Sequence, residues 1–254
     1  MLTYIKVLTV VAGAAALAAL GACKKPTDRQ ASAADTLDAL SADCRKGDGT
    51  ACLKVATAHY QGHGAHQSYA RAAEWFARAC KTKKPEGCFH LANMLELGRG
   101  VSKDIAAAMQ QYTKACRGKV GPACYRLGQF WFSGEGGTRS FDRATTFFKE
   151  SCDLTHKYQA LSCFYVGQAF ASGQGVGRSM VQCAKFFKKS CSLGGRKGCT
   201  GLAALYEKGL GGLPKDLGKA RQLYSRACDL GQLAACEGVK NLDRAQAPMS
   251  NKTK

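Results

Sequence analysis

Acidic residues are scarce in this chain of 254 residues, which has 18 Asp and Glu against 37 Lys and Arg and a formal net charge of +19. Such a balance favours acidic partners, such as anionic lipid head groups, other polyanions or acidic proteins, and says nothing direct about fold. Nucleic acid would be the natural partner of so basic a protein in the cytosol. The N-terminus indicates a different compartment, so we do not expect a nucleic-acid partner.

Catalytic motifs are missing as well. The chain contains no S-x-x-K, S-D-N or K-T-G, the signatures of a serine nucleophile and its base in β-lactamases and penicillin-binding proteins. It contains no H-E-x-x-H, so the zinc-binding motif of a large class of metallopeptidases is absent. We therefore expect no catalytic residues of these classes and no cofactor.

A hydrophobic run long enough to span a membrane is missing too. Only 17 uncharged residues separate Lys6 from Lys24, whereas a spanning helix needs about 20. Residues 1–22 have the layout of a secretory signal peptide, with a retained transmembrane anchor as the alternative. The segment LGAC at 20–23 resembles the lipobox of bacterial lipoproteins. This resemblance implies that Cys23 becomes the lipidated first residue of the mature chain, and Lys24 after it implies the periplasmic side of the outer membrane, with surface exposure or secretion as alternatives.

Cysteine, in contrast, is abundant. Fourteen cysteines in an exported protein indicate a disulfide framework, and removing Cys23 leaves thirteen, of which twelve form pairs close in sequence. Zinc is the competing interpretation, but structural zinc sites usually place paired cysteines two to four residues apart, so we expect disulfides and no metal. The expected pairs are Cys44–Cys52, Cys80–Cys88, Cys116–Cys124, Cys152–Cys163, Cys191–Cys199 and Cys228–Cys236.

The cysteine pairs mark a repeat. Successive first cysteines lie 36, 36, 36, 39 and 37 residues apart, and a fixed period in this range is the signature of a stacked helical-repeat solenoid. Twelve residues before each first cysteine stands a Ser or Asp, the residue types that cap a helix N-terminus. These expected N-caps of the second helix of each unit, called helix B here, are Ser32, Ser68, Asp104, Ser140, Ser179 and Asp216.

Two further columns of helix B indicate its buried face. A large residue four before the first cysteine and a small residue eight before it lie on one side of a helix, so that a neighbouring helix can approach closely. Cys183 stands in the small column, where four of the other five units have Ala, which predicts a buried small residue. The alternative is a reactive or pairing thiol.

Helix A of each unit follows the second cysteine and ends at a Gly-x-Gly. Such a glycine is typical of the left-handed cap that ends a helix. No strand precedes these glycines and none of them opens a helix, which argues against a phosphate-binding loop. His59, His63 and His66 are four and three apart, as metal ligands on a helix can be, but His59 falls in the buried column of helix A and the glycines around His63 should break the helix.

Segments such as GPACYRLGQFWFSGEG with FDRATTFFKESC, and GRKGCTGLAALYEKGLGG with DLGKARQLYSRACDLG, resemble Sel1-like repeats, relatives of the tetratricopeptide repeat. The paired cysteines make the chain similar to the Helicobacter cysteine-rich proteins over residues 32–240. The resemblance implies an all-α, right-handed αα superhelix of about five full repeats plus half-repeat caps. It also carries a label, because that family has been named for β-lactamase or penicillin-binding activity. Residues 23–31 would then be a lipid-anchored linker, and 241–254 a disordered basic tail.

If helix A lines the concave face, as in tetratricopeptide repeats, its unburied positions form a groove. We expect a central ladder of amides, able to bind an extended peptide backbone, flanked by aromatic rings that accept side chains. The expected groove residues are Asn93, Gln129, Gln168, Phe89, Tyr125, Phe164 and Phe132. The simpler alternative is that some of these aromatics pack between repeats.

The turns between helix B and the next helix A are rich in Lys and Arg, which predicts a basic edge able to face anionic lipid. The residues concerned include Arg78, Lys81, Lys83, Lys84, Lys114, Arg117, Lys119, Lys189, Arg196, Lys197 and Arg226. The sequence thus predicts a lipid-anchored, disulfide-stabilised scaffold that binds a protein or peptide in the bacterial envelope, with a β-lactamase or penicillin-binding protein as the alternative.

Overall fold

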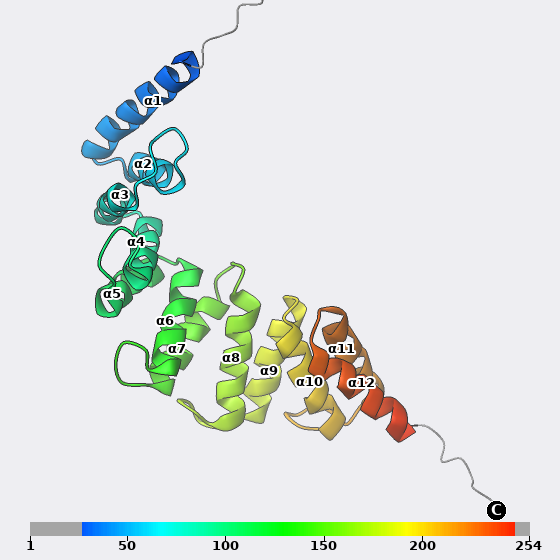
Figure 1. The fold of residues 1–254 in the computed structure, drawn as a ribbon. Coiled ribbons are helices and arrows are strands. Elements are labelled where there is room, and N and C mark those ends of the chain that lie inside the picture. Colours follow the sequence, from blue (N-terminus) through cyan, green and yellow to red (C-terminus); the bar gives the residue numbers. More distant parts are fainter. Residues whose placement is uncertain (1–26, 247–254) are drawn as a thin grey trace, which may run out of the picture.

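The computed structural model describes residues 27–246, and within this range it contains twelve α-helices and no strand (Figure 1). The helices are α1 (Thr27–Arg45), α2 (Gly49–Gln61), α3 (Tyr69–Lys81), α4 (Pro85–Leu97), α5 (Ile105–Arg117), α6 (Gly121–Ser133), α7 (Phe141–Cys152), α8 (Gln159–Ser172), α9 (Met180–Ser192), α10 (Arg196–Lys208), α11 (Leu217–Asp229) and α12 (Leu233–Gln246). None of the described helices is both long and apolar enough to cross a membrane.

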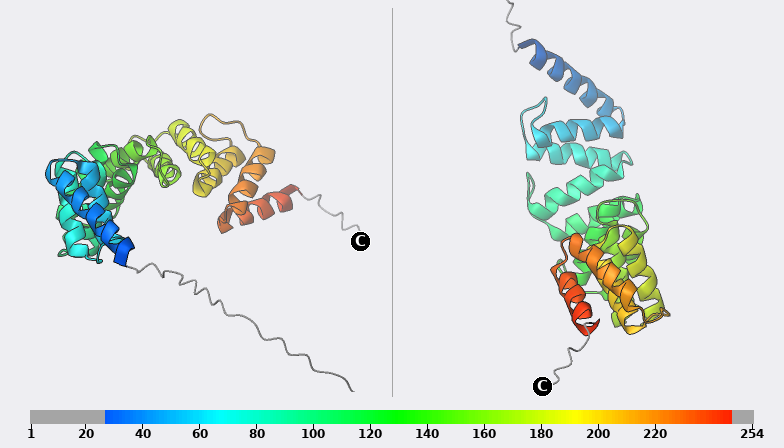
Figure 2. Two further views of the ribbon diagram at one scale, coloured as in Figure 1. Left: turned by 90° about the horizontal axis from the view of Figure 1, so that it is seen from above. Right: turned by 90° about the vertical axis from the view of Figure 1, so that its right-hand side faces the viewer.

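Each helix packs on the next one along the chain, so the molecule is an αα solenoid rather than a globule. The even-numbered helices are the A helices and the odd-numbered ones are the B helices. Figures 1 and 2 show the path curving from α1 at one end to α12 at the other. The predicted fold class is confirmed.

Five of the six predicted N-caps are confirmed. The side chains of Ser68, Asp104, Ser140, Ser179 and Asp216 each accept a hydrogen bond from the backbone N–H three residues on. These bonds satisfy donors that the first turn of a helix leaves free, which is why each B helix begins at this position.

The sixth predicted cap is wrong, because α1 begins at Thr27 and Ser32 lies inside it. Residues 27–31 contain no glycine or proline to stop a helix before Ser32, so the predicted linker is helical from Thr27 on. The predicted tail also starts too early, since α12 continues to Gln246. Leu242 is buried there, and Arg221 Nε lies 2.6 Å from Asp243 Oδ1, which ties this turn to α11. The signal peptide and Cys23 lie outside the described residues.

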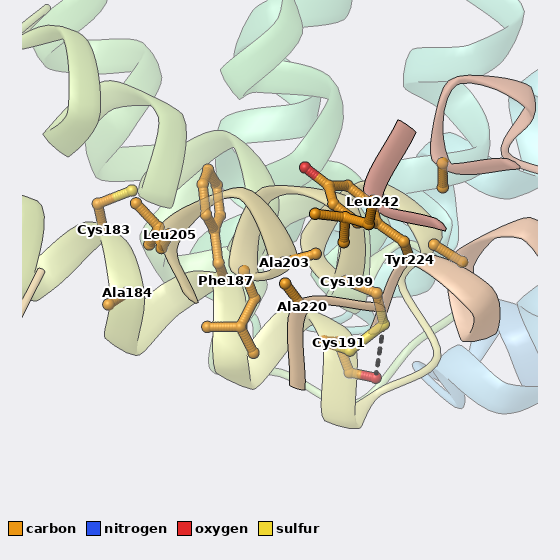
Figure 3. Close-up of a cluster of buried hydrophobic side chains, with 13 residues drawn as sticks. Cys183, Ala184, Phe187, Cys191, Cys199, Ala203, Leu205, Ala220, Tyr224 and Leu242 are labelled. Carbon is orange, nitrogen blue, oxygen red and sulfur yellow. Dashed lines mark hydrogen bonds between the residues drawn. A yellow bond between two sulfur atoms is a disulfide. The ribbon is translucent and has the colours of Figure 1, made fainter. Parts of the chain in front are cut away.

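The predicted buried columns form the core. The large residues of the B helices Phe76, Tyr112, Phe148, Phe187 and Tyr224 are at most 7% exposed. Cys183 is fully buried in the small column, in a cluster with Leu205 and Phe187 that Figure 3 draws. Its burial raises the pKa of the Cys183 thiol to about 11, so the thiol stays protonated and unreactive near neutral pH. The prediction of a small buried residue is confirmed.

The second glycine of the Gly-x-Gly has a role that its sequence does not reveal. A Cβ on Gly100 would lie 2.3 Å from the backbone carbon of Tyr69, and one on Gly175 would lie 2.2 Å from that of Phe141. Both glycines have positive φ, so any side chain would be strained as well as blocked. The loop after each of these A helices therefore packs directly on the first turn of the preceding B helix, which sets the spacing between repeats.

All six predicted disulfides are present, with Cα–Cα distances between 4.4 and 4.8 Å. Each joins the end of a B helix to the first turn of the next A helix. In the loop-entropy account, closing a ring of this size stabilises the fold by about 2.5 kcal/mol. Cys183 is the free cysteine among the described residues.

Candidate binding site on the inner face

The A helices form the inner side of the superhelix. In Figure 1, α2 and α4 lie on the inside of the bend and α3 and α5 on the outside. Further along the chain, the A helices α8 and α10 contact one another directly across the repeat boundary. The inner face is therefore built mainly from the A helices, although several of its side chains also contact the B helices.

A polar cluster occupies the middle of this face, between α4, α5 and α6. The hydroxyl of Tyr112 lies 2.6 Å from Asn93 Oδ1 and 2.7 Å from Glu96 Oε2, and it has one hydrogen to donate between them. Arg126 reaches back from α6 and donates to both carboxylate oxygens of Glu96, with Nε 3.1 Å from each. This charge-assisted pair bridges two successive repeats.

Burial strengthens the charge interactions in this cluster and shifts its pKa values. The side chain of Glu96 is 14% exposed and that of Arg126 is 29% exposed, so water screens their attraction only in part. Burial, and then the Glu96 carboxylate, raise the pKa of Tyr112 above its ordinary value, because an ionised phenolate here would be desolvated and repelled. The hydrogen bonds to Glu96 in turn raise the pKa of Arg126. Both shifts keep Tyr112 neutral and Arg126 charged at neutral pH.

The structure changes what two of the predicted groove residues can do. Tyr125 is 7% exposed and stacks on Tyr158, with ring centroids 4.7 Å apart, so its ring is not free to receive a partner's side chain. Gln129 uses both ends of its amide within the chain: its Nε2 donates to the Tyr125 hydroxyl at 3.0 Å, and its Oε1 accepts from Arg126 at 3.1 Å. The prediction that Tyr125 and Gln129 contact a ligand is therefore corrected, because packing between repeats occupies both.

The other predicted groove residues remain partly open, but they lie in separate hollows. Phe132 is 41% exposed and borders a hollow of ≈20 Å³ with Gln168, whose exposed side chain forms no hydrogen bond within the described chain. The buried part of the Phe132 ring packs on the rings of Phe141, Phe148 and Tyr165. Asn93 lines a second hollow of ≈200 Å³ together with Tyr60 and Arg99. Phe89 is half-buried against Tyr112, with ring centroids 6.0 Å apart.

Phe164 lies apart from these residues. Its ring stacks on Phe187 at 5.5 Å and lines a hollow of ≈420 Å³ beside Lys157 and Lys197, at the edge formed by the turns. The expected continuous ladder is therefore a row of distinct hollows, of which the Phe132–Gln168 and Asn93 hollows keep free hydrogen-bonding groups.

Sequence reasoning missed Arg126 and the Glu–Tyr pairs. A second pair links Tyr224 to Glu207 at 2.9 Å, in the last full repeat. A signal was available: where the position eight after the second cysteine is Glu, the large residue of the next B helix is Tyr, and where it is aromatic or Ala, that residue is Phe. Arg126 gave no such signal, because its position in the other repeats is Lys54, His90, Tyr165 and Gly201.

One serine and histidine come close enough to suggest catalysis, but their geometry does not support it. Ser151 Oγ lies 3.0 Å from His156 Nε2 and is fully buried. The backbone N–H of Tyr158 donates to His156 Nδ1, so the ring proton is on Nε2 and donates to the Ser151 carbonyl at 2.9 Å. A buried hydroxyl beside a protonated nitrogen is not an activated nucleophile. This contact gives the β-lactamase label no support.

Metal binding is not supported among the described residues either. Cys116, Cys124 and Glu150 lie within 4.8 Å of one another, but the two cysteines form a disulfide and offer no thiolate. The Glu150 carboxylate touches this disulfide, 3.1 Å from Cys116 Sγ, without a hydrogen bond because the bridged sulfur has no proton. His59 is buried with Nδ1 3.3 Å from the carbonyl of His66, whereas His63 is exposed, so these histidines do not converge.

Comparison with known proteins agrees with this architecture. Over 76% of this chain and 75% of the other, the fold is similar to a Sel1 repeat protein from Oxalobacter formigenes, with a TM-score of 0.64 and 20% identity. A protective antigen of uropathogenic Escherichia coli with an SLR fold has a TM-score of 0.67 and 22% identity over 83% of this chain. This chain spans about half of that antigen, 52% of its length. Cysteine-rich protein B of Helicobacter pylori matches 52% of this chain at 24% identity, with a TM-score of 0.41.

A search of curated proteins found no match. The Sel1 repeat family, in contrast, matches five successive segments: 49–81, 85–119, 121–156, 160–195 and 196–232. Each segment holds one A helix and the following B helix, in the order in which the structure pairs them. These segments make up well over half of the sequence, and the chain belongs to the Sel1 repeat family.

Proposed function

We propose that this protein is a scaffold that binds a protein or peptide partner on its inner face, in the bacterial cell envelope, and that a lipid on Cys23 anchors it there. The observation that carries the proposal is the pair of exposed side chains Phe132 and Gln168, since the hollow between them, ≈20 Å³, is too small to take a partner's side chain. A large ring that is 41% exposed stands there next to a free amide, while the polar groups of the neighbouring cluster are already paired. Exposed aromatics beside unpaired hydrogen-bonding groups are typical of peptide-binding surfaces.

The envelope location rests on the signal peptide and lipobox resemblances and is supported by the disulfides. Six bridges among the described residues favour an oxidising compartment, since cytosolic proteins of ordinary bacteria keep their thiols reduced. Intact mass spectrometry of membrane-extracted protein tests this part. We expect a diacyl or triacyl adduct on a chain that begins at Cys23, and a mass increase of 12 hydrogens on full reduction. An unmodified Cys23, or twelve free thiols before reduction, would contradict it.

The basic edge is a second contact surface, to anionic lipid. Lys83 and Lys119 have positive φ values of 61° and 65°, a conformation that costs a residue with a side chain about 1 kcal/mol. Gly47, Gly194 and Gly231 hold the corresponding place in three other turns. Lysine at a position suited to glycine supports a role for its charge, because strained residues persist where function needs them.

Photo-crosslinking tests the inner face directly. We expect a photoreactive phenylalanine analogue at position 132 to capture a discrete partner in the native envelope, and we expect Gln168→Ala to weaken that capture. The same analogue at position 181, where Val181 is 60% exposed on a B helix, is the matched control. Equal capture at both positions would contradict a specific inner-face partner.

Lipid binding is tested separately with Lys83→Gly and Lys119→Gly. We expect each variant to be as stable as the native protein or more so, by up to about 1 kcal/mol, and to bind vesicles of anionic phospholipid more weakly. Lys208→Gly serves as a charge-matched control, because Lys208 is exposed at the end of α10, away from these turns. If it weakens vesicle binding as much as the two turn variants, the edge has no special role.

A further inference from the structure

A hollow on the other side of the repeats has features of a second binding site. It lies between the B helices α5 and α7, with α6 as its floor, and none of the seven predicted groove residues lines it. Two adjoining cavities of ≈360 and ≈580 Å³ share Met109, Trp131 and Arg143. Their combined size is in the range of sites that hold a small ligand or two to three side chains of a peptide.

The hollow is lined by the side chains that are enriched at binding hot spots. Trp131 forms its floor, flanked by Met109 from α5 and Phe147 from α7. The guanidinium of Arg143 lies over the indole, 4.4 Å from the ring centroid. Trp131 therefore contacts the flat face of the Arg143 guanidinium. The N–H groups along the edge of that guanidinium remain free to bind a carboxylate.

Charge identifies the kind of partner. Arg139 lies at the rim, 5.0 Å above the ring of Phe141, and neither Arg139 nor Arg143 forms an ion pair with another residue of the described chain. The acidic residue that lines the hollow, Glu135, lies 3.8 Å from Arg126, which neutralises part of its charge. The hollow thus combines an apolar floor with two uncompensated positive charges.

The chain's own segments lack the negative charge that an occupant of this hollow needs. Residues 247–254 contain two lysines and no acid, and a second copy of the chain would bring a further +19 charge. Both occupants would be repelled at low and physiological ionic strength.

We infer that the Trp131–Arg143 hollow binds an acidic segment of a protein partner, in which a large apolar side chain occupies the floor and a neighbouring carboxylate binds the edge of Arg143. The same two positions hold a cation over an aromatic ring in α10 and α11, where Lys219 Nζ lies 4.9 Å from the centroid of Tyr206, but only the Trp131–Arg143 pair combines an indole with a guanidinium. At these positions α3 has Arg71, whereas α2 has His59 in place of an aromatic platform. This site is independent of the inner face, so either proposal can fail without the other.

The chain provides its own reporter and control. It has two tryptophans, and Trp75→Phe leaves Trp131 as the single indole. The probe is an acetylated and amidated Glu-Glu-Leu-Phe-Glu-Glu peptide, and its uncharged counterpart has Gln in place of each Glu. We expect saturable binding of the acidic peptide, seen as a change in Trp131 emission. We expect the uncharged peptide to bind at least tenfold more weakly.

Substitution of two different arginines distinguishes binding at a specific site from general attraction between opposite charges. Arg143→Gln should weaken the acidic peptide at least tenfold, while Arg71→Gln, which removes the same charge from the same helical position, should weaken it less than twofold. Both side chains are exposed, so both variants should keep the fold, which the far-UV spectrum and the six disulfides verify.

A second measurement covers the case in which Trp131 emission responds weakly. The methyl group of Met109 should shift in a carbon–proton spectrum on addition of the acidic peptide, and those of Met94 and Met180 should not. Three results would overturn the proposal. They are an equal loss of affinity in Arg143→Gln and Arg71→Gln, equal affinity for the acidic and the uncharged peptide, and the absence of any saturable change by either method.

Discussion

Removal of the Tyr112 hydroxyl should destabilise the protein more than removal of the same group elsewhere. Tyr112 is fully buried, and its hydroxyl is shared between Asn93 and Glu96, a carboxylate already paired with Arg126. A hydrogen bond to a charged group contributes roughly 1.5–3 kcal/mol, and Tyr112→Phe also leaves the Asn93 oxygen without its donor. We expect a loss of about 2 kcal/mol.

Tyr224→Phe is the matched control for this loss. Tyr224 Oη lies 2.9 Å from Glu207 Oε2, but among the described residues no arginine holds Glu207 in place. That carboxylate can turn toward water when its partner is lost, so we expect about 1 kcal/mol.

Urea unfolding with intact disulfides gives the total change in the free energy of unfolding. Repeat proteins open locally, so hydrogen exchange of the amides must show where the loss falls. Tyr112→Phe should speed exchange in α4, α5 and α6 and leave α10 and α11 unchanged. The reasoning fails if Tyr224→Phe costs as much as Tyr112→Phe, or if exchange rises evenly along the chain.

Three further predictions use the same structure. The pKa of Tyr112 is raised in the folded chain, so the stabilising contribution of Tyr112 is complete below the ordinary tyrosine pKa of about 10 and is lost as the pH rises above that value. Thermal midpoints measured between about pH 9 and 11 should therefore fall more steeply for the native protein than for Tyr112→Phe. Gly100→Ala should cost more than about 2 kcal/mol in urea unfolding, whereas Gly177→Ala, which has open space around it, should cost less than about 0.5 kcal/mol. In a chain with Cys23→Ser, a thiol reagent at pH 8 should label nothing in the folded state and only Cys183 after unfolding without reduction; more labelled sites would mean unformed disulfides.

The local features of the fold could be predicted because each recurs in several repeats. One Ser or Asp before a helix is weak evidence for a cap, but the same residue types at one register in six units are strong evidence, and five of them cap a helix. Prediction failed at the two ends, where a unit has a neighbour on one side only. Ser32 matches the register but has no preceding Gly-x-Gly to end a helix before it, so α1 runs through it.

The binding surface was harder to predict because exposure is not periodic. Tyr125 and Phe132 occupy the same kind of position on one A helix, yet one ring is 7% exposed and the other 41%. The difference arises in the fourth turn, which is longer than the others and brings Tyr158 onto the Tyr125 ring. A single insertion thus decided which aromatic faces solvent, and nothing in the repeat pattern indicated where the inserted residues would pack.

Because each repeat contacts only its neighbours, single substitutions can show which surface of this protein a partner binds. Each hollow is bounded by two adjacent repeats: the Phe132–Gln168 hollow by α6, α7 and α8, and the Trp131–Arg143 hollow by α5, α6 and α7. Energetic effects in a solenoid pass mainly between neighbours, and disulfides at every turn limit how far a disturbance spreads. Substitutions at exposed side chains in one hollow should therefore leave another hollow intact even when both lie on the same A helix. Phe132 and Trp131 are adjacent in sequence but point about 100° apart around α6, into different hollows, so a partner lost with one and kept with the other would identify its side of the superhelix without a structure of the complex.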